Sequence, residues 1–182
     1  MPSSVADEGQ PTIRVAVAAN FMTTARTLSR RFESKHGMSV QLVSGASGTL
    51  FAQIVNGAPF DLFLSADQKK PLALYEAGLG TTRPRTYAIG ALALWDPGGQ
   101  FSTLSLARTA IANGAAVAIA NPRLAPYGSA AASVLERWRL SHVDIRRVTL
   151  QNVSQAFQAA QSGNVPLAIV ARAQLQQSGD EL

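Results

Sequence analysis

Short apolar runs alternate with amphipathic stretches along most of this chain. The apolar runs have the length of buried strands, and the amphipathic stretches repeat apolar residues at helical spacing. Strands are expected at 13–18, 40–43, 60–65, 86–95, 117–120, 145–150 and 167–171, and helices at about 21–37, 48–57, 71–78, 105–113, 128–140 and 153–161. This alternation predicts an α/β fold with mainly parallel strands.

The run TYAIGALALW is the longest predicted strand, and a strand of that length can link two lobes. Lobe boundaries are expected near Ala88–Gly90 and near Ile169–Ala171, which gives two α/β lobes between which the chain crosses twice. The predicted lobes are 12–88, with 172–182 returning to it, and 89–171.

Four junctions place a strand-like run directly before a helix start, with small or hydroxylic residues at each junction. They are Val15–Asn20 into Phe21, Val40–Ser47 into Gly48, Val117–Tyr127 into Gly128, and Val148–Asn152 into Val153. The first turn of a helix leaves backbone N–H groups unpaired and pointing outward. Several such ends around one cleft make a neutral, donor-rich site, so the pattern favours oxyanion binding over catalysis.

The charge of the chain is basic but scattered. Lys plus Arg number 16 against 11 Asp plus Glu, for a net charge of +5. Basic residues gather in two segments without interleaved aromatic residues or a nucleic-acid motif, which favours solvated helix faces and no nucleic-acid partner. The net charge still favours anionic ligands.

The chain contains no cysteine, which excludes disulfides, thiol nucleophiles and thiolate metal sites. The opening MPSSVADEGQP is polar, so it is not a signal peptide, and no apolar run reaches membrane-spanning length. The opening segment is interpreted as the N-terminal tail of a mature protein, and the protein is not expected to insert into a membrane.

Candidate catalytic groups do not combine into a recognisable site. Asp61 and Asp67 could form a carboxylate pair or hold a metal, but nothing completes such a site. His36 precedes a helix-ending glycine and His142 lies in a loop, where exposed roles are expected. Without a nucleophile triad, a phosphate-binding glycine loop or metal-ligand spacing, we expect no enzyme activity, no catalytic residue and no metal site.

Several ordered segments together resemble the periplasmic molybdate-binding proteins of ABC-type uptake systems, in the branch with Asn after the first strand. The segments are VAVAANF, SGASGTLFAQIVNGAPFDLFLSAD, TYAIGALALW, ANPRLAPYGSAA and QNVSQAFQAAQSGN. The resemblance implies a type II periplasmic-binding-protein fold with a hinged cleft. It also implies molybdate or tungstate as ligand, no cofactor, a periplasmic location and an ABC permease as partner.

The resemblance also implies a ligand set, by matching motif. The residues are Asn20 and Ser47 in the first lobe, Tyr127 and the backbone N–H of Val153 in the second, and Ala19 and Gly48 as added backbone donors. Each position has a structural alternative. Asn20 and Ser47 are common helix N-caps, Tyr127 could be a packing residue, Val153 could belong to the core, and Asn152 or Ser154 could donate in its place.

Two departures from the family bear on these expectations. Some members carry a Tyr ligand where this chain has Ala171, and relatives continue beyond Leu182 with a strand and helix that return to the first lobe. On this basis the first lobe is expected to be incomplete here. Two alternatives stay open: a receptor for sulfate or phosphate, and a regulatory ligand-binding domain of the same fold.

Overall fold

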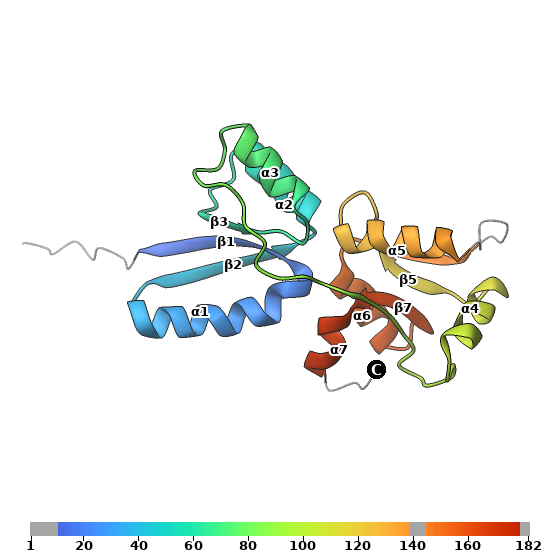
Figure 1. The fold of residues 1–182 in the computed structure, drawn as a ribbon. Helices are drawn as coiled ribbons and strands as arrows, with labels where there is room; N and C mark the ends of the chain where they lie inside the picture. Colours follow the sequence, from blue (N-terminus) through green and yellow to red (C-terminus); the bar gives the residue numbers. More distant parts are fainter. Residues whose placement is uncertain (1–10, 139–144, 179–182) are drawn as a thin grey trace, which may run out of the picture.

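The computed structural model describes residues 11–138 and 145–178. Its strands form two sheets with helices packed beside them, which confirms the predicted α/β class. The two sheets lie in opposite halves of the molecule, and the chain passes from one to the other through an extended segment after α3 (Figure 1). His142 and the first ten residues of the polar opening lie outside the described residues.

The first sheet is parallel, with strand order β2-β1-β3. Its elements are β1 (Thr12–Ala18), α1 (Met22–His36), β2 (Ser39–Gly45), α2 (Ser47–Val55), β3 (Leu62–Leu64) and α3 (Lys69–Glu76). Val15 and Val17 of β1 pack with Ala25 of α1 in a small buried cluster. α1 ends at Gly37, where a positive φ of 67° lets the amide donate back to the carbonyl of Glu33. The turn brings the chain directly into β2.

The second sheet has strand order β4-β7-β5-β6, with β4 antiparallel to β7 and the other pairs parallel. Its strands are β4 (Leu92–Trp95), β5 (Val117–Ala120), β6 (Arg147–Leu150) and β7 (Leu167–Ala171), and its helices are α4 (Leu104–Ala112), α5 (Pro126–Arg137), α6 (Val153–Gln161) and α7 (Arg172–Ser178). Every residue of β5 and β7 is buried. Apolar clusters cover both faces of the sheet, as expected for strands that read as continuous apolar runs.

The predicted long strand at 86–95 is wrong in its first half, because β4 begins only at Leu92. Residues 83–91 are irregular and cross between the sheets, and Ile89 is 94% exposed. A strand is held by ladder hydrogen bonds to a neighbour. β7 supplies them from Leu92 onward, so apolar character in the preceding residues does not produce a strand.

α7 was not expected from the sequence. Leu175 of this helix is buried in a cluster of the second sheet, whereas Gln177 donates to the Thr24 hydroxyl on α1 at 3.2 Å. α7 therefore contacts both halves of the molecule. The division into lobes at 12–88 with 172–182, and 89–171, stays a prediction.

Candidate functional site

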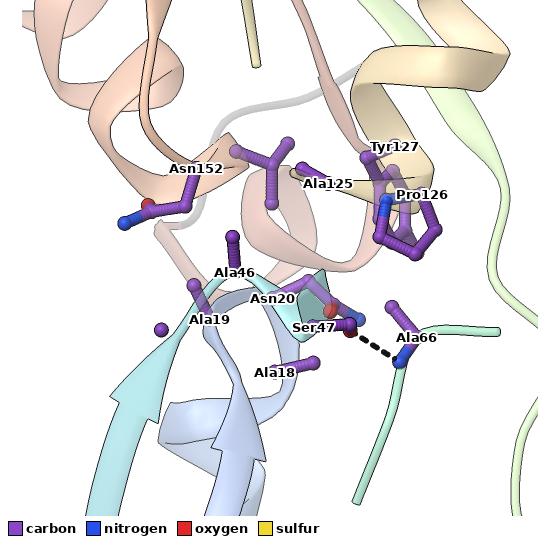
Figure 2. A pocket seen from close by; sticks show the side chains of 12 residues that line it. Ala18, Ala19, Asn20, Ala46, Ser47, Ala66, Ala125, Pro126, Tyr127 and Asn152 are labelled. Carbon is purple, nitrogen blue, oxygen red and sulfur yellow. Dashed lines mark hydrogen bonds between the residues drawn. The ribbon is translucent and has the colours of Figure 1, made fainter. Parts of the chain in front are cut away.

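The candidate site is a small pocket where β1 and β2 of the first sheet end and helices α5 and α6 of the second half begin (Figure 2). Its cavity volume is about 10 Å³, roughly the room that one water molecule needs. In this conformation it has room for little more than a water molecule, so a larger ligand requires the two halves to move apart. The lining residues are Ala18, Ala19, Asn20, Gly45, Ala46, Ser47, Ala66, Ala125, Pro126, Tyr127, Asn152 and Val153.

The pocket is electrically neutral in its side chains. Among the residues that the structure describes, no carboxylate and no cationic side chain lines it. The polar side chains at its wall belong to Asn20, Ser47, Tyr127 and Asn152, all of which carry hydrogen-bond donors. An anion held here would be bound by neutral groups and not by an ion pair.

Helix N-termini supply the remaining polarity of the pocket. The 3-10 turn η1 (Ala19–Phe21) leads into α1, and α2, α5 and α6 also begin at the pocket wall. The first turns of α1, α2, α5 and α6 contain no acidic residue. No carboxylate of these turns therefore competes for their outward-pointing N–H groups, which favour a negative charge.

Ser47 is the most buried polar residue at the pocket, with 1% of its surface exposed. It is not the N-cap of α2, because that position belongs to Ala46 and Ser47 is the first helical residue. The Ser47 hydroxyl oxygen accepts the N–H of Ala66 at 2.9 Å (Figure 2). This bond fixes the hydroxyl in position and leaves its own hydrogen available for donation.

Asn20 lies in the middle of η1 and caps neither helix. The N-cap positions of η1 and α1 are Ala18 and Phe21, and neither makes a side-chain cap hydrogen bond. The Asn20 side chain is on the same side of the pocket as Ser47 in Figure 2. The N-cap alternatives for Asn20 and Ser47 are therefore both removed.

Tyr127 is the second residue of α5, after Pro126. Because proline has no N–H, the Tyr127 amide is the first backbone donor at this helix end. Its hydroxyl points elsewhere, since it lies against Gly90 of the crossing segment. Burial raises the pKa of the Tyr127 phenol, which therefore stays a neutral hydroxyl. The geometry favours the amide of Tyr127 over its phenol as the pocket donor.

Val153 is the first residue of α6, lines the pocket and is 3% exposed. The Ser154 hydroxyl next to it donates to the carbonyl of Ala19 at 3.1 Å, so its hydrogen is in use. The Asn152 side-chain oxygen caps the helix by accepting the Gln155 N–H at 3.1 Å, which leaves the side-chain N–H groups of Asn152 as donors. The Val153 N–H and the Asn152 side chain therefore both stay candidate donors at this position.

Gly48 needs a correction, because its N–H donates to the carbonyl of Leu124 at 2.8 Å and Gly48 does not line the pocket. A Cβ at Gly48 would lie 2.7 Å from that same oxygen. In this conformation Gly48 joins the two halves of the molecule and has no amide hydrogen left for a ligand. Ala19 does line the pocket, while its carbonyl accepts hydrogen bonds from Met22 and Ser154.

The structure also brings residues to the site that sequence reasoning missed. Ala66 follows β3 and donates its amide to Ser47, and Ala125 and Pro126 form the start of α5. β3 is parallel to β1, so its carboxyl end meets the same edge of the sheet as those of β1 and β2. Only this strand order could have placed Ala66 at the site from the sequence, because the alanine side chain has no polar group that would mark it as a site residue.

The two candidate carboxylates have structural partners away from the pocket. Asp61 accepts the backbone N–H of Arg14 at 2.7 Å. Asp67 accepts the backbone N–H of Lys70 at 3.0 Å and pairs with its ammonium group at 2.5 Å, at the start of α3. The His36 ring lies against Phe32. In the described ranges no three His, Asp or Glu side chains gather as a metal site would require.

Comparisons with known proteins agree with this geometry. The family described as bacterial extracellular solute-binding protein matches residues 13–182. The molybdate-binding protein ModA of Rhodobacter capsulatus is 38% identical over 164 residues, covering 88% of this chain and 64% of its own length. The ModA of Azotobacter vinelandii is 37% identical over 174 residues, covering 92% of this chain and 67% of its own.

The solved structure of the periplasmic molybdate-binding protein of Azotobacter vinelandii superimposes with a TM-score of 0.83 at 36% identity. The match covers 93% of this chain and 75% of that one. The expected type II periplasmic-binding-protein fold is confirmed. This chain spans 64% of the length of its Rhodobacter relative. No helix in the described ranges has the length and apolar character to cross a membrane. On the family match and these identities, the chain belongs to the bacterial extracellular solute-binding proteins, with molybdate-binding proteins among its relatives.

Proposed function

We propose that this chain binds molybdate or tungstate in the pocket between its two halves. The observation that carries the proposal is the convergence of helix N-termini and the Ser47 hydroxyl on a pocket without charged side chains. A fully deprotonated oxyanion can only accept hydrogen bonds, and these groups can supply them at the pocket wall. The relatives named as molybdate-binding proteins support the same ligand.

The proposed donors are Asn20 and Ser47 from the first half, and the amides of Tyr127 and Val153 from the second. The N–H of Ala19 is a further candidate, whereas the N–H of Gly48 is already bonded to Leu124. Binding therefore requires both halves at once, so ligand capture and closure of the cleft occur together.

The chemistry of the pocket argues against phosphate as the main ligand. Hydrogen phosphate carries a proton that needs an acceptor, and the described wall offers no carboxylate for it. Sulfate has no such proton and is smaller than molybdate, so discrimination between these two anions would depend on the size of the cavity that closes around the ligand. Discrimination between molybdate and tungstate is expected to be slight, because the two are nearly equal in size.

The family match supports a cellular role in uptake. We propose that the chain acts as the extracytoplasmic receptor of an ABC-type uptake system, located in the periplasm, which delivers its anion to a membrane permease. The function is binding and not catalysis. The proposed lobes are 12–88 with 172–182, and 89–171, with the irregular crossing at 83–91 as the hinge.

Calorimetric titration with molybdate, tungstate, sulfate and phosphate in one buffer tests the proposal. We expect one-to-one binding of the first two and weak or no binding of the others. Ser47→Ala should weaken molybdate affinity by about tenfold to a hundredfold, as loss of a hydrogen bond to a charged ligand does. Ser34→Ala, at an exposed serine of α1, is the matched control. A folded chain that binds neither molybdate nor tungstate would overturn the proposal.

A further inference from the structure

One side-chain hydrogen bond joins the two halves of the molecule beside the pocket and does not involve the groups proposed to contact the anion. The Ser154 hydroxyl, in the first turn of α6, donates to the carbonyl of Ala19 in η1 at 3.1 Å, over a sequence separation of 135 residues. Ser154 lies next to Val153 and Ala19 lies next to Asn20, both proposed donors. This bond therefore ties together the two helix ends that hold donors from opposite sides.

The Ala19 carbonyl, which accepts this hydrogen bond, determines the direction of a proposed donor, the N–H of Asn20. The Ala19 carbonyl also accepts the N–H of Met22, so both of its lone pairs are engaged. The peptide between Ala19 and Asn20 is planar and trans, so its C=O and N–H point in opposite directions. Fixing the carbonyl fixes the direction of the Asn20 N–H, and polarises it as a donor.

A second residue holds Ser154 in its orientation. Gln174 of α7 donates its side-chain N–H to the Ser154 hydroxyl oxygen at 3.2 Å, and its own side-chain oxygen accepts the N–H of Ala171 at 3.2 Å. With its oxygen occupied by Gln174, the Ser154 hydroxyl directs its hydrogen to Ala19. A directed chain of hydrogen bonds runs from the end of β7, through Gln174 and Ser154, to the pocket wall.

We propose that Ser154 is a positioning residue that latches the closed cleft and orients the Ala19–Asn20 peptide, without contacting the anion. The inference rests on the proposed function for its ligand, but the latch itself is a contact between the two halves of the protein. Ser154→Ala should then lower the ratio of closed to open molecules by about fivefold, the worth of one ordinary hydrogen bond. Where the open form predominates without ligand, the affinity for molybdate should weaken by the same factor.

The absence of cysteine from the chain allows a direct measurement of closure. Spin labels at Ser34→Cys on α1 and Ser133→Cys on α5, both at exposed positions, report the distance between the halves by pulsed electron resonance. The pair is measured with and without saturating molybdate in the wild-type background, in Ser154→Ala and in Ser154→Thr, which keeps the hydroxyl. Ser162→Ala, just after α6, is the matched control.

A closed population that falls in Ser154→Ala, recovers in Ser154→Thr and is unchanged in Ser162→Ala supports the latch. Equal distance distributions and equal molybdate affinities in Ser154→Ala and wild type overturn it. A wild-type chain that shows no closed population in either condition also overturns it. Failure of the wild type to bind molybdate overturns the proposed function instead, and the latch is then judged from the distances measured without the anion.

Discussion

The hydroxyl of Tyr127 occupies the space that a side chain at residue 90 would need. A Cβ built on Gly90 would lie 2.0 Å from the Tyr127 hydroxyl oxygen and 3.0 Å from the ring carbon that bears it. Gly90 belongs to the crossing between the sheets, and Tyr127 belongs to the helix that begins at the pocket. The missing side chain at Gly90 thus lets the hinge pack directly against the second half of the site.

Gly90→Ala is expected to weaken molybdate binding by displacing the Tyr127 side chain and the start of α5. Overpacking of a core costs about 1–3 kcal/mol; because Gly90 is exposed and meets the end of a side chain, we expect the lower end of this range, about fivefold in affinity. Calorimetric titration with molybdate measures the effect. The control is Gly98→Ala, where the added Cβ meets its nearest neighbour at an ordinary 3.4 Å.

The same contact predicts partial rescue by a second substitution. Tyr127→Phe removes the oxygen that lies nearest to the added Cβ, so the double variant Gly90→Ala with Tyr127→Phe should bind molybdate more tightly than Gly90→Ala alone. Equal affinities of the double and the single variant would show that the defect of Gly90→Ala does not arise from this contact.

Gly48→Ala is expected to separate affinity from stability. The added Cβ would meet the Leu124 carbonyl at 2.7 Å and oppose closure, so molybdate affinity should fall by about fivefold or more. Alanine favours a helix over glycine by about 0.5–1 kcal/mol, so the free energy of unfolding without ligand should be unchanged or higher. Denaturant unfolding and calorimetry on the same sample test this. A variant that loses stability and keeps its affinity would contradict the closure role of Gly48.

Val153→Pro removes one backbone donor while keeping the helix that carries it. Val153 is the first residue of α6, where proline is well tolerated, and Asn152 before it has the extended φ of −146° and ψ of 171° that proline requires. Loss of the N–H should weaken molybdate affinity by about tenfold to a hundredfold, as measured by calorimetry.

The control for that substitution is Val153→Ala. It also shortens the buried side chain but keeps the N–H, so it should retain nearly all of the affinity. If the proline and alanine variants bind molybdate equally well, the Val153 amide is not a ligand donor.

Tyr87 predicts a loss of stability at high pH. Burial, and then the nearby Tyr127, raise the pKa of Tyr87 to about 12, against about 10 in an unfolded chain. Between pH 10 and pH 12 the folded state keeps a proton on Tyr87 that the unfolded state has released. The contribution of Tyr87 to the free energy of unfolding is therefore complete below pH 10 and decreases as the pH rises toward 12. Urea unfolding at several pH values measures the slope.

Tyr87→Phe should make that slope shallower. The variant also loses the hydrogen bond from the Tyr87 hydroxyl to the carbonyl of Ser65, which lowers stability by about 1 kcal/mol at pH values where the phenol is protonated. The comparison is therefore made between slopes and not between absolute values. Equal slopes in the two proteins would assign the alkaline loss to other groups.

Local patterns in the sequence predicted the helix starts well because the signals lie within a few residues. β5, α6 and β7 begin and end where the apolar periodicity places them, and Gly37 ends α1 as predicted. The four junctions that suggested an oxyanion site do meet at one pocket, because the parallel strands of each sheet end at one edge and the pocket lies between those two edges. The identity of the donors at that pocket remains a prediction.

The features that the sequence did not predict depend on contacts between segments that are far apart along the chain. The apolar residues before Leu92 look like a strand, but whether they form one depends on a neighbour that the local sequence does not specify. Gly48 looks like a free donor at a helix start, and only the approach of Leu124 from the other half occupies its N–H. The Ser154 hydroxyl likewise finds its acceptor 135 residues away.

A site built from the first turns of helices depends little on the side chains of the residues that form it. Every residue except proline carries the same backbone N–H, so the donors at Tyr127 and Val153 would survive most substitutions of those residues. Alanine scanning would then leave much of the ligand set unseen, and natural variation at these positions would leave the chemistry of the pocket intact. Backbone-directed changes, such as proline or an ester in place of the amide, would be needed to reveal which atoms hold the anion.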